Sequence, residues 1–112
     1  MSITEAINLI EQFGASNNIP VAFSHFTQNV TPPYLVYITP GTDNFNADNI
    51  VYAKITELEI ELYSRVNVLQ TESLLESFLT SNGFCWDKTS QTWIDEDKVT
   101  MSIYTLGNML NG

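Results

Sequence analysis

An alternation of apolar and acidic residues in the middle of the sequence constrains the fold most strongly. Within the apolar run 50–63, every second residue between positions 57 and 62 is a glutamate. Strand side chains point to opposite faces with a period of two, so the run predicts a strand with one apolar and one acidic face. The apolar positions are Leu58, Ile60 and Leu62, and the acidic positions are Glu57, Glu59 and Glu61. Because an isolated hairpin is marginal in water, we expect the rest of the chain to cover the apolar face.

Two helical patterns flank this strand. Ser2 and Glu5 have the spacing of a capping box, and apolar residues then recur at three- and four-residue intervals up to Gly14, where we expect the helix to end. A second helix is expected to begin at Asn67 and to end at Gly83. Its predicted apolar face consists of Leu69, Leu74, Leu75, Phe78 and Leu79.

The remaining apolar segments predict short strands separated by turn residues. The expected strands are residues 21–26, 34–39, 50–63, 84–87, 92–95 and 99–106, with the polar run KTSQ between the fourth and the fifth. Two helices and mostly sequential strands favour an α+β fold, in which two helices pack on a largely antiparallel β-sheet in the order α-β-β-β-α-β-β-β. With 112 residues, the chain is expected to form a single domain, 1–112.

The charge balance disfavours several classes of partner. Four Lys and Arg oppose thirteen Asp and Glu, which gives a formal net charge of -9, and the basic residues are scattered singly. Tight nucleic-acid binding needs clustered cations, and an anionic membrane surface would repel this chain. No apolar run approaches the roughly 20 residues that cross a bilayer, and the N-terminal segment is acidic where a secretory signal is basic. We expect a soluble protein that does not bind membranes.

Catalytic and metal-binding signatures are weak. Cys85 is the single cysteine and lies between Phe84 and Trp86, so we expect a buried thiol in a reducing compartment. His25 is the single histidine and is expected at the surface or on an edge strand. The carboxylates lack a histidine, lysine or nucleophile at a recognisable spacing, so we expect no enzymatic activity, no metal and no cofactor. A deep pocket with shifted carboxylates would instead indicate an enzyme whose site the sequence hides.

The loop 42–49 is rich in Asp and Asn. Its composition suits a hard cation, but the fixed spacing, central glycine and terminal glutamate of a calcium loop are missing, so turns capped by the Asn and Asp side chains explain it better. An apolar Phe45 at the tip is typical of a loop that contacts a partner. The residues of this hypothetical interface are Asp43, Asn44, Phe45 and Asn46.

The same loop carries a resemblance to a known family. The run DNFNADNIVYAKI, followed by ELEIELYS, resembles the small tail-completion or tail-terminator proteins of siphophages and prophages of Gram-positive bacteria. The resemblance continues through the second helix, with its paired leucines and glutamates, to the last strand, and so spans residues from about 33 to 104.

The resemblance implies a structural role in virion assembly. Such proteins cap the head-proximal end of the tail tube as a closed ring, commonly hexameric, stop tube growth and join the head connector. The implied partners are further copies of the chain, the tail tube protein and the head-tail connector protein, in the virion tail and, during assembly, in the host cytoplasm. As a hypothesis, the loop at Phe45 reaches a neighbour, while Glu57, Glu59 and Glu61 face the lumen or an adjoining protein, so that DNA passes without sticking.

Two alternatives remain open. A head-completion protein would share this small α+β design. A monomeric acidic binding module, such as a nucleic-acid mimic or an inhibitor of a basic protein, would suit the charge of -9 equally well. A terminator assembles into rings, whereas a mimic acts alone on a basic protein.

Overall fold

The computed structural model describes residues 1–42, 45–47, 50–53 and 55–110, and side chains within 1–42 and 55–107. In chain order the elements are α1 (Ile3–Asn17), β1 (Val21–Phe23), β2 (Tyr34–Ile38), β3 (Phe45–Ala47), β4 (Ile50–Ala53), β5 (Ile55–Ser64), α2 (Val68–Ser81), β6 (Trp86–Ile94) and β7 (Val99–Leu110). The predicted fold class is confirmed, because two helices accompany a mostly antiparallel sheet. Neither of these helices is both long and apolar enough to span a membrane.

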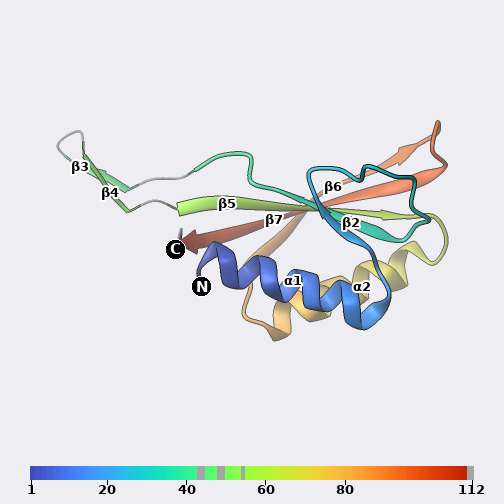
Figure 1. Ribbon diagram of the computed structural model, residues 1–112, viewed down its shortest axis with the longest axis horizontal. Helices are drawn as coiled ribbons and strands as arrows, with labels where there is room; N and C mark the ends of the chain where they lie inside the picture. Colours follow the sequence, from blue (N-terminus) through green and yellow to red (C-terminus); the bar gives the residue numbers. More distant parts are fainter. Residues whose placement is uncertain (43–44, 48–49, 54, 111–112) are drawn as a thin grey trace.

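The main sheet has five strands in the order β1-β2-β5-β7-β6. β1 is parallel to β2, and the other pairs are antiparallel. Both helices pack on one face of this sheet, which is called the covered face here, and the opposite face is called the open face (Figure 1). β3 and β4 pair only with each other in a separate two-stranded sheet, which lies beyond the end of β5.

The hydrophobic core lies between the helices and the covered face. The predicted apolar positions of β5, Leu58, Ile60 and Leu62, are fully buried, as are their cross-strand partners Leu35 and Tyr104. Because the strand period is two, the glutamates between them point to the open face, as predicted. The predicted burial of the apolar side of β5 and the predicted placement of its glutamates on the opposite side are therefore both confirmed.

The expected role of Gly14 as a helix stop is wrong. Ser2 caps α1 as predicted, since its hydroxyl accepts a hydrogen bond from the Glu5 N–H, but the helix continues to Asn17 and ends where Asn18 takes up a left-handed conformation. A Cβ at Gly14 would lie 2.4 Å from Cγ2 of Val21. Gly14 thus lets the helix approach β1 closely, and a glycine needed for contact looks the same in sequence as one that ends a helix.

The predicted apolar face of α2 is partly wrong. Leu75 and Leu79 are buried as expected, but Leu69 and Leu74 are exposed. The helix is rotated so that Glu72 takes a buried position facing the sheet. Sequence periodicity could not show this, because a glutamate on an apolar face needs partners from distant strands before it can be buried.

Several predicted strand boundaries are wrong: the expected strand 21–26 ends at Phe23, and the strand expected at 99–106 extends to Leu110. The run 50–63 is divided between β4 and β5, which belong to different sheets, and part of the expected loop 42–49 forms β3. The two short strands expected at 84–87 and 92–95 are one strand, β6, with a register shift between Lys88 and Ser90. Polar residues that resemble a turn are also suited to an exposed edge strand. The sequence thus has five strands before α2 and two after it, in place of three and three.

The expected burial of Cys85 is also wrong, because this cysteine is exposed. Its neighbours Phe84 and Trp86 do pack on the core, Phe84 as a buried and Trp86 as a partly buried side chain. Cys85 lies between them and points away from the core. Successive side chains of extended backbone point to opposite sides, so the inward-pointing Phe84 and Trp86 leave Cys85 pointing outward.

Candidate interaction surface on the open sheet face

Part of the predicted interface loop forms β3 of the β3–β4 hairpin. Asp43 and Asn44 lie outside the described residues. Phe45 and Asn46 belong to β3, where the backbone of Phe45 is aligned with Ala53 and that of Asn46 with Val51. The hairpin extends the molecule along its longest axis, whose extent is 50 Å against 28 and 25 Å for the other two (Figure 1). The backbone of Phe45 and Asn46 therefore lies outside the main sheet, beyond the end of β5.

The open face of the main sheet mixes carboxylates with apolar side chains. Glu61 is flanked across the strands by Val36 and Ile103, and Glu59 by Ile38 and Thr105. Both glutamates are half-buried, whereas Glu57 is exposed, next to a register shift. The predicted carboxylate row exists along β5, but the face as a whole is not simply acidic, because neighbouring strands contribute apolar residues that the sequence of β5 does not reveal.

An aromatic cluster continues this face toward the far end of β5. The rings of Tyr34 and Tyr63 are stacked at 4.7 Å between centroids, and Phe26 meets Tyr34 edge to face at 5.4 Å. The Tyr63 hydroxyl donates a hydrogen bond of 2.7 Å to Oε1 of Glu61. Burial, this hydrogen bond and the negative charge of Glu61 together raise the pKa of Tyr63, so its hydroxyl remains a donor. Tyr63 thus links the aromatic cluster to the carboxylates of β5.

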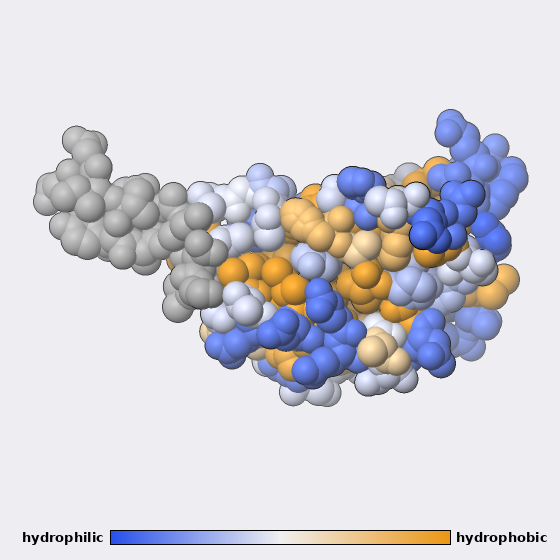
Figure 2. All heavy atoms as spheres, in the orientation of Figure 1, coloured by the Kyte–Doolittle hydropathy of each residue, from blue (hydrophilic) through white to orange (hydrophobic). Residues whose placement is uncertain are grey.

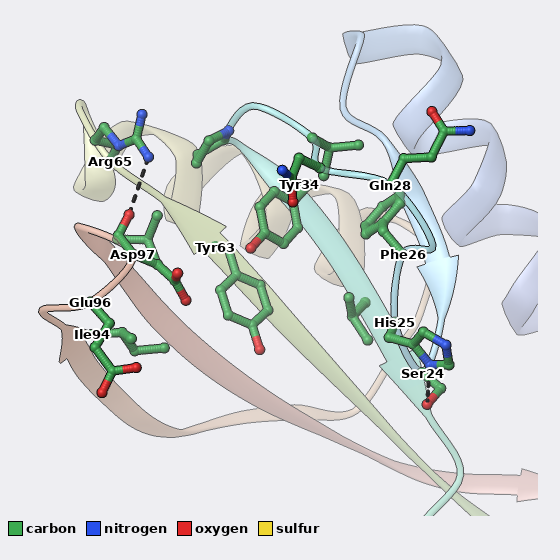
Figure 3. A pocket seen from close by; sticks show the side chains of 15 residues that line it. Ser24, His25, Phe26, Gln28, Tyr34, Tyr63, Arg65, Ile94, Glu96 and Asp97 are labelled. Carbon is green, nitrogen blue, oxygen red and sulfur yellow. Dashed lines mark hydrogen bonds between the residues drawn. The ribbon is translucent and has the colours of Figure 1, made fainter.

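A pocket of about 660 Å³ lies beside these rings. Its walls come from the loop 24–33, from the ends of β2 and β5, and from the turn between β6 and β7. Figure 3 shows the ring of Tyr63 between Tyr34 on one side and Asp97 on the other, with Glu96 and Ile94 farther along the same wall. The volume is within the range of roughly 300–1,000 Å³ that is typical of ligand sites.

The charged groups around the pocket differ in the hydrogen bonds and ion pairs that they form. Arg65 donates to two backbone carbonyls, from Nε to Lys98 at 3.1 Å and from the guanidinium Nη2 to Asp97 at 3.2 Å. The side chains of Glu96 and Asp97 form no ion pair with any described residue. Strongly polar residues gather at this end of the molecule, around the β6–β7 turn (Figure 2). The pocket therefore has two carboxylates without an ion pair among the described residues and an arginine that donates to two backbone carbonyls.

Sequence reasoning missed this pocket because it joins distant segments. From the sequence, Tyr34 and Tyr63 are simply the ends of two expected strands, and the sequence does not give the order of strands in the sheet. The pairing of Tyr34 with Tyr63 brings the rings together, and the β6–β7 turn then supplies Asp97. His25 also lines the pocket and is exposed, which confirms its expected place at the surface.

A second charged site lies on the covered face, where α2 meets β6 and β7. The carboxylate of Glu72, 3% exposed, accepts hydrogen bonds from Lys88 Nζ at 3.0 Å, from Gln91 Nε2 at 2.9 Å and from the Ser102 hydroxyl. Burial alone would raise the pKa of Glu72, but the hydrogen bonds and the Lys88 charge outweigh it and hold the pKa below its usual value. This network joins α2 to β6 and β7.

The described residues show no candidate metal site, and comparison with known proteins identifies no family. Among the described residues, no group of three or more His, Cys, Asp or Glu side chains is arranged to hold a metal ion. No protein-family model matches the sequence, and no curated protein matches it.

Proposed function

We propose that this chain is a virion assembly protein of the tail-terminator type, which closes into a ring at the head-proximal end of a siphophage tail tube. The observation that carries the proposal is the β3–β4 hairpin, whose two strands pair only with each other beyond the main sheet. A two-stranded sheet is marginal in water by itself, so a neighbouring subunit or the tail tube would stabilise it. The hairpin also contains part of the segment that carries the family resemblance.

The arrangement supplies two different surfaces for head-to-tail contacts. The hairpin is one, and the body of the main sheet is the other. A ring forms when one patch of a subunit binds a different patch of the next and the rotation closes. In such a ring, the face with Glu57, Glu59 and Glu61 lines the lumen or meets an adjoining protein, and its charge keeps DNA from sticking during passage.

The first experiment is the solution mass by light scattering after size exclusion, with and without the tail tube protein. A hexamer would have a mass of roughly 76 kDa, six times 12.6 kDa. Formation that depends on the tube supports termination, whereas formation that depends on the head connector indicates head completion. Phe45→Ser should abolish the ring, because it removes the apolar residue of β3.

A matched control is Leu69→Ser, which changes a side chain that is 73% exposed on α2, outside the hairpin. This variant should still assemble. A chain that remains at 12.6 kDa with either partner would contradict the ring and favour the monomeric acidic binding module.

A further inference from the structure

We propose that the pocket beside Tyr63 receives an arginine side chain from a basic segment of a partner protein. The ring proposal does not specify such a contact, and the pocket lies at the end of the sheet opposite the β3–β4 hairpin (Figure 1). The inference therefore concerns a separate surface and can be tested on the isolated chain.

The aromatic cluster provides flat surfaces for a guanidinium group. Tyr34 and Tyr63 are stacked with an interplanar angle of 18°, and Phe26 is held edge to face against Tyr34. A guanidinium group stacks on aromatic faces and is more weakly hydrated than an ammonium group, so it loses less hydration free energy on entering a partly enclosed site. Both tyrosines contribute to the pocket lining, so a planar cation that enters it meets an aromatic wall.

The carboxylates supply the opposite charge. Burial raises the pKa of Tyr34, and the charge of Asp97 raises it further while that of Arg65 lowers it; on Tyr63 the charge of Asp97 acts in the same direction but is the smallest effect, after burial and Glu61. Glu96 lies on the same turn as Asp97, and neither acid forms an ion pair with a described residue. Arginine presents five donors in a rigid fork and can bond separate carboxylates and carbonyls at once. Besides Arg65, whose guanidinium forms no ion pair with them, the pocket therefore has two carboxylates to which a second cation could bind.

The charges around the pocket argue against an anionic occupant. Arg65 is the arginine of the pocket, and two of its nitrogens, Nε and Nη2, donate to the backbone carbonyls of Lys98 and Asp97. An anion would compete with these bonds and would be repelled by Glu96 and Asp97. The net charge of -9 also attracts basic proteins over long distances and repels acidic ones.

The test is a titration of ¹⁵N-labelled protein with the peptide acetyl-Gly-Gly-Arg-Gly-Gly-amide, followed by amide chemical shifts. A single side chain should bind with a dissociation constant of about 1 mM. Saturable shifts are expected in the segments 24–34, 63–65 and 94–99, which surround the pocket. The citrulline peptide, which has nearly the same shape and no charge, should produce no saturable shifts. Equal shifts with both peptides, or none with arginine, would overturn the proposal.

Matched variants separate the pocket from the general negative charge. Asp97→Asn should weaken binding by roughly fivefold to tenfold, because it removes a charged hydrogen-bond acceptor from the pocket. Asp87→Asn makes the same change in net charge at an exposed residue of β6 outside the pocket, and should change the affinity by less than about twofold. Equal weakening by both variants would contradict a specific site. Spectra of each free variant show whether its fold is intact.

Discussion

Glu72 of α2 and Glu61 of β5 lie on opposite sides of the main sheet, and they differ in how many hydrogen bonds their carboxylates accept. Glu72 is 3% exposed and accepts hydrogen bonds from three side chains. Glu61 is half-buried, and Tyr63 is the one described side chain that donates to it. A buried carboxylate with several donors holds elements together, whereas one with few donors keeps acceptor sites for another molecule.

The same contrast extends to the apolar residues of each face. On the covered face, Ile60 and its neighbours are sealed by α1 and α2. On the open face, Ile38 and Ile103 are only partly buried, although Val36, beside Glu61, is 4% exposed. The covered face thus supplies the stability of the fold, and the open face has the mixture of apolar and charged groups that is typical of a contact surface.

The largest expected effect is a loss of stability on truncating the covered face. Ile60→Ala should lower the free energy of unfolding by about 2–5 kcal/mol, because it leaves a cavity at a fully buried position. Ile103→Ala on the open face should cost about 1 kcal/mol, since its side chain is already in partial contact with water. Denaturant unfolding of the two variants measures the difference. Equal losses would show that both faces are buried in solution.

A smaller effect is expected for the carboxylates, and it should depend on pH. Glu72→Gln should cost about 1–3 kcal/mol at neutral pH, because an amide places donors where Lys88, Gln91 and Ser102 already donate. The pKa of Glu72 is lowered in the folded state, so its contribution is present above the ordinary value of 4.5 and is lost as the pH falls through the folded pKa. The variant should therefore have a flatter stability profile in acid.

The control for this prediction is the triple change of Glu57, Glu59 and Glu61 to Gln. These side chains are exposed or half-buried, so the free energy of unfolding at neutral pH should change by less than about 1 kcal/mol.

The same variant tests the lumen hypothesis. If the row of Glu57, Glu59 and Glu61 lines a lumen, the triple variant should still assemble tails but deliver DNA less efficiently. Normal delivery would exclude the lumen role, and a stability loss as large as that of Glu72→Gln would contradict the contrast between the faces.

Local patterns predicted local structure well and failed where distant strands meet. Capping at Ser2, the alternation of β5 and the fold class follow from spacing along the chain. The burial of Glu72 depends on donors from β6 and β7, and the pocket depends on the pairing of Tyr34 with Tyr63. Spacing contains no information on strand order, so neither the buried carboxylate nor the aromatic wall could be predicted.

Two serines on the covered face provide the finest test. The Ser64 hydroxyl is buried and has no hydrogen-bond partner among the described residues, whereas the buried Ser102 hydroxyl donates to Glu72. Ser102→Ala should cost about 1–2 kcal/mol, because it removes a donor from a buried carboxylate, and Ser64→Ala should be neutral or stabilising by up to about 1 kcal/mol. Thermal and denaturant unfolding of both variants measure the two changes. A stability loss on Ser64→Ala equal to that on Ser102→Ala would mean that the Ser64 hydroxyl forms a hydrogen bond in solution. Both buried serine hydroxyls of the covered face would then have hydrogen-bond partners, whereas the carboxylate of Glu61 keeps acceptor sites for another molecule.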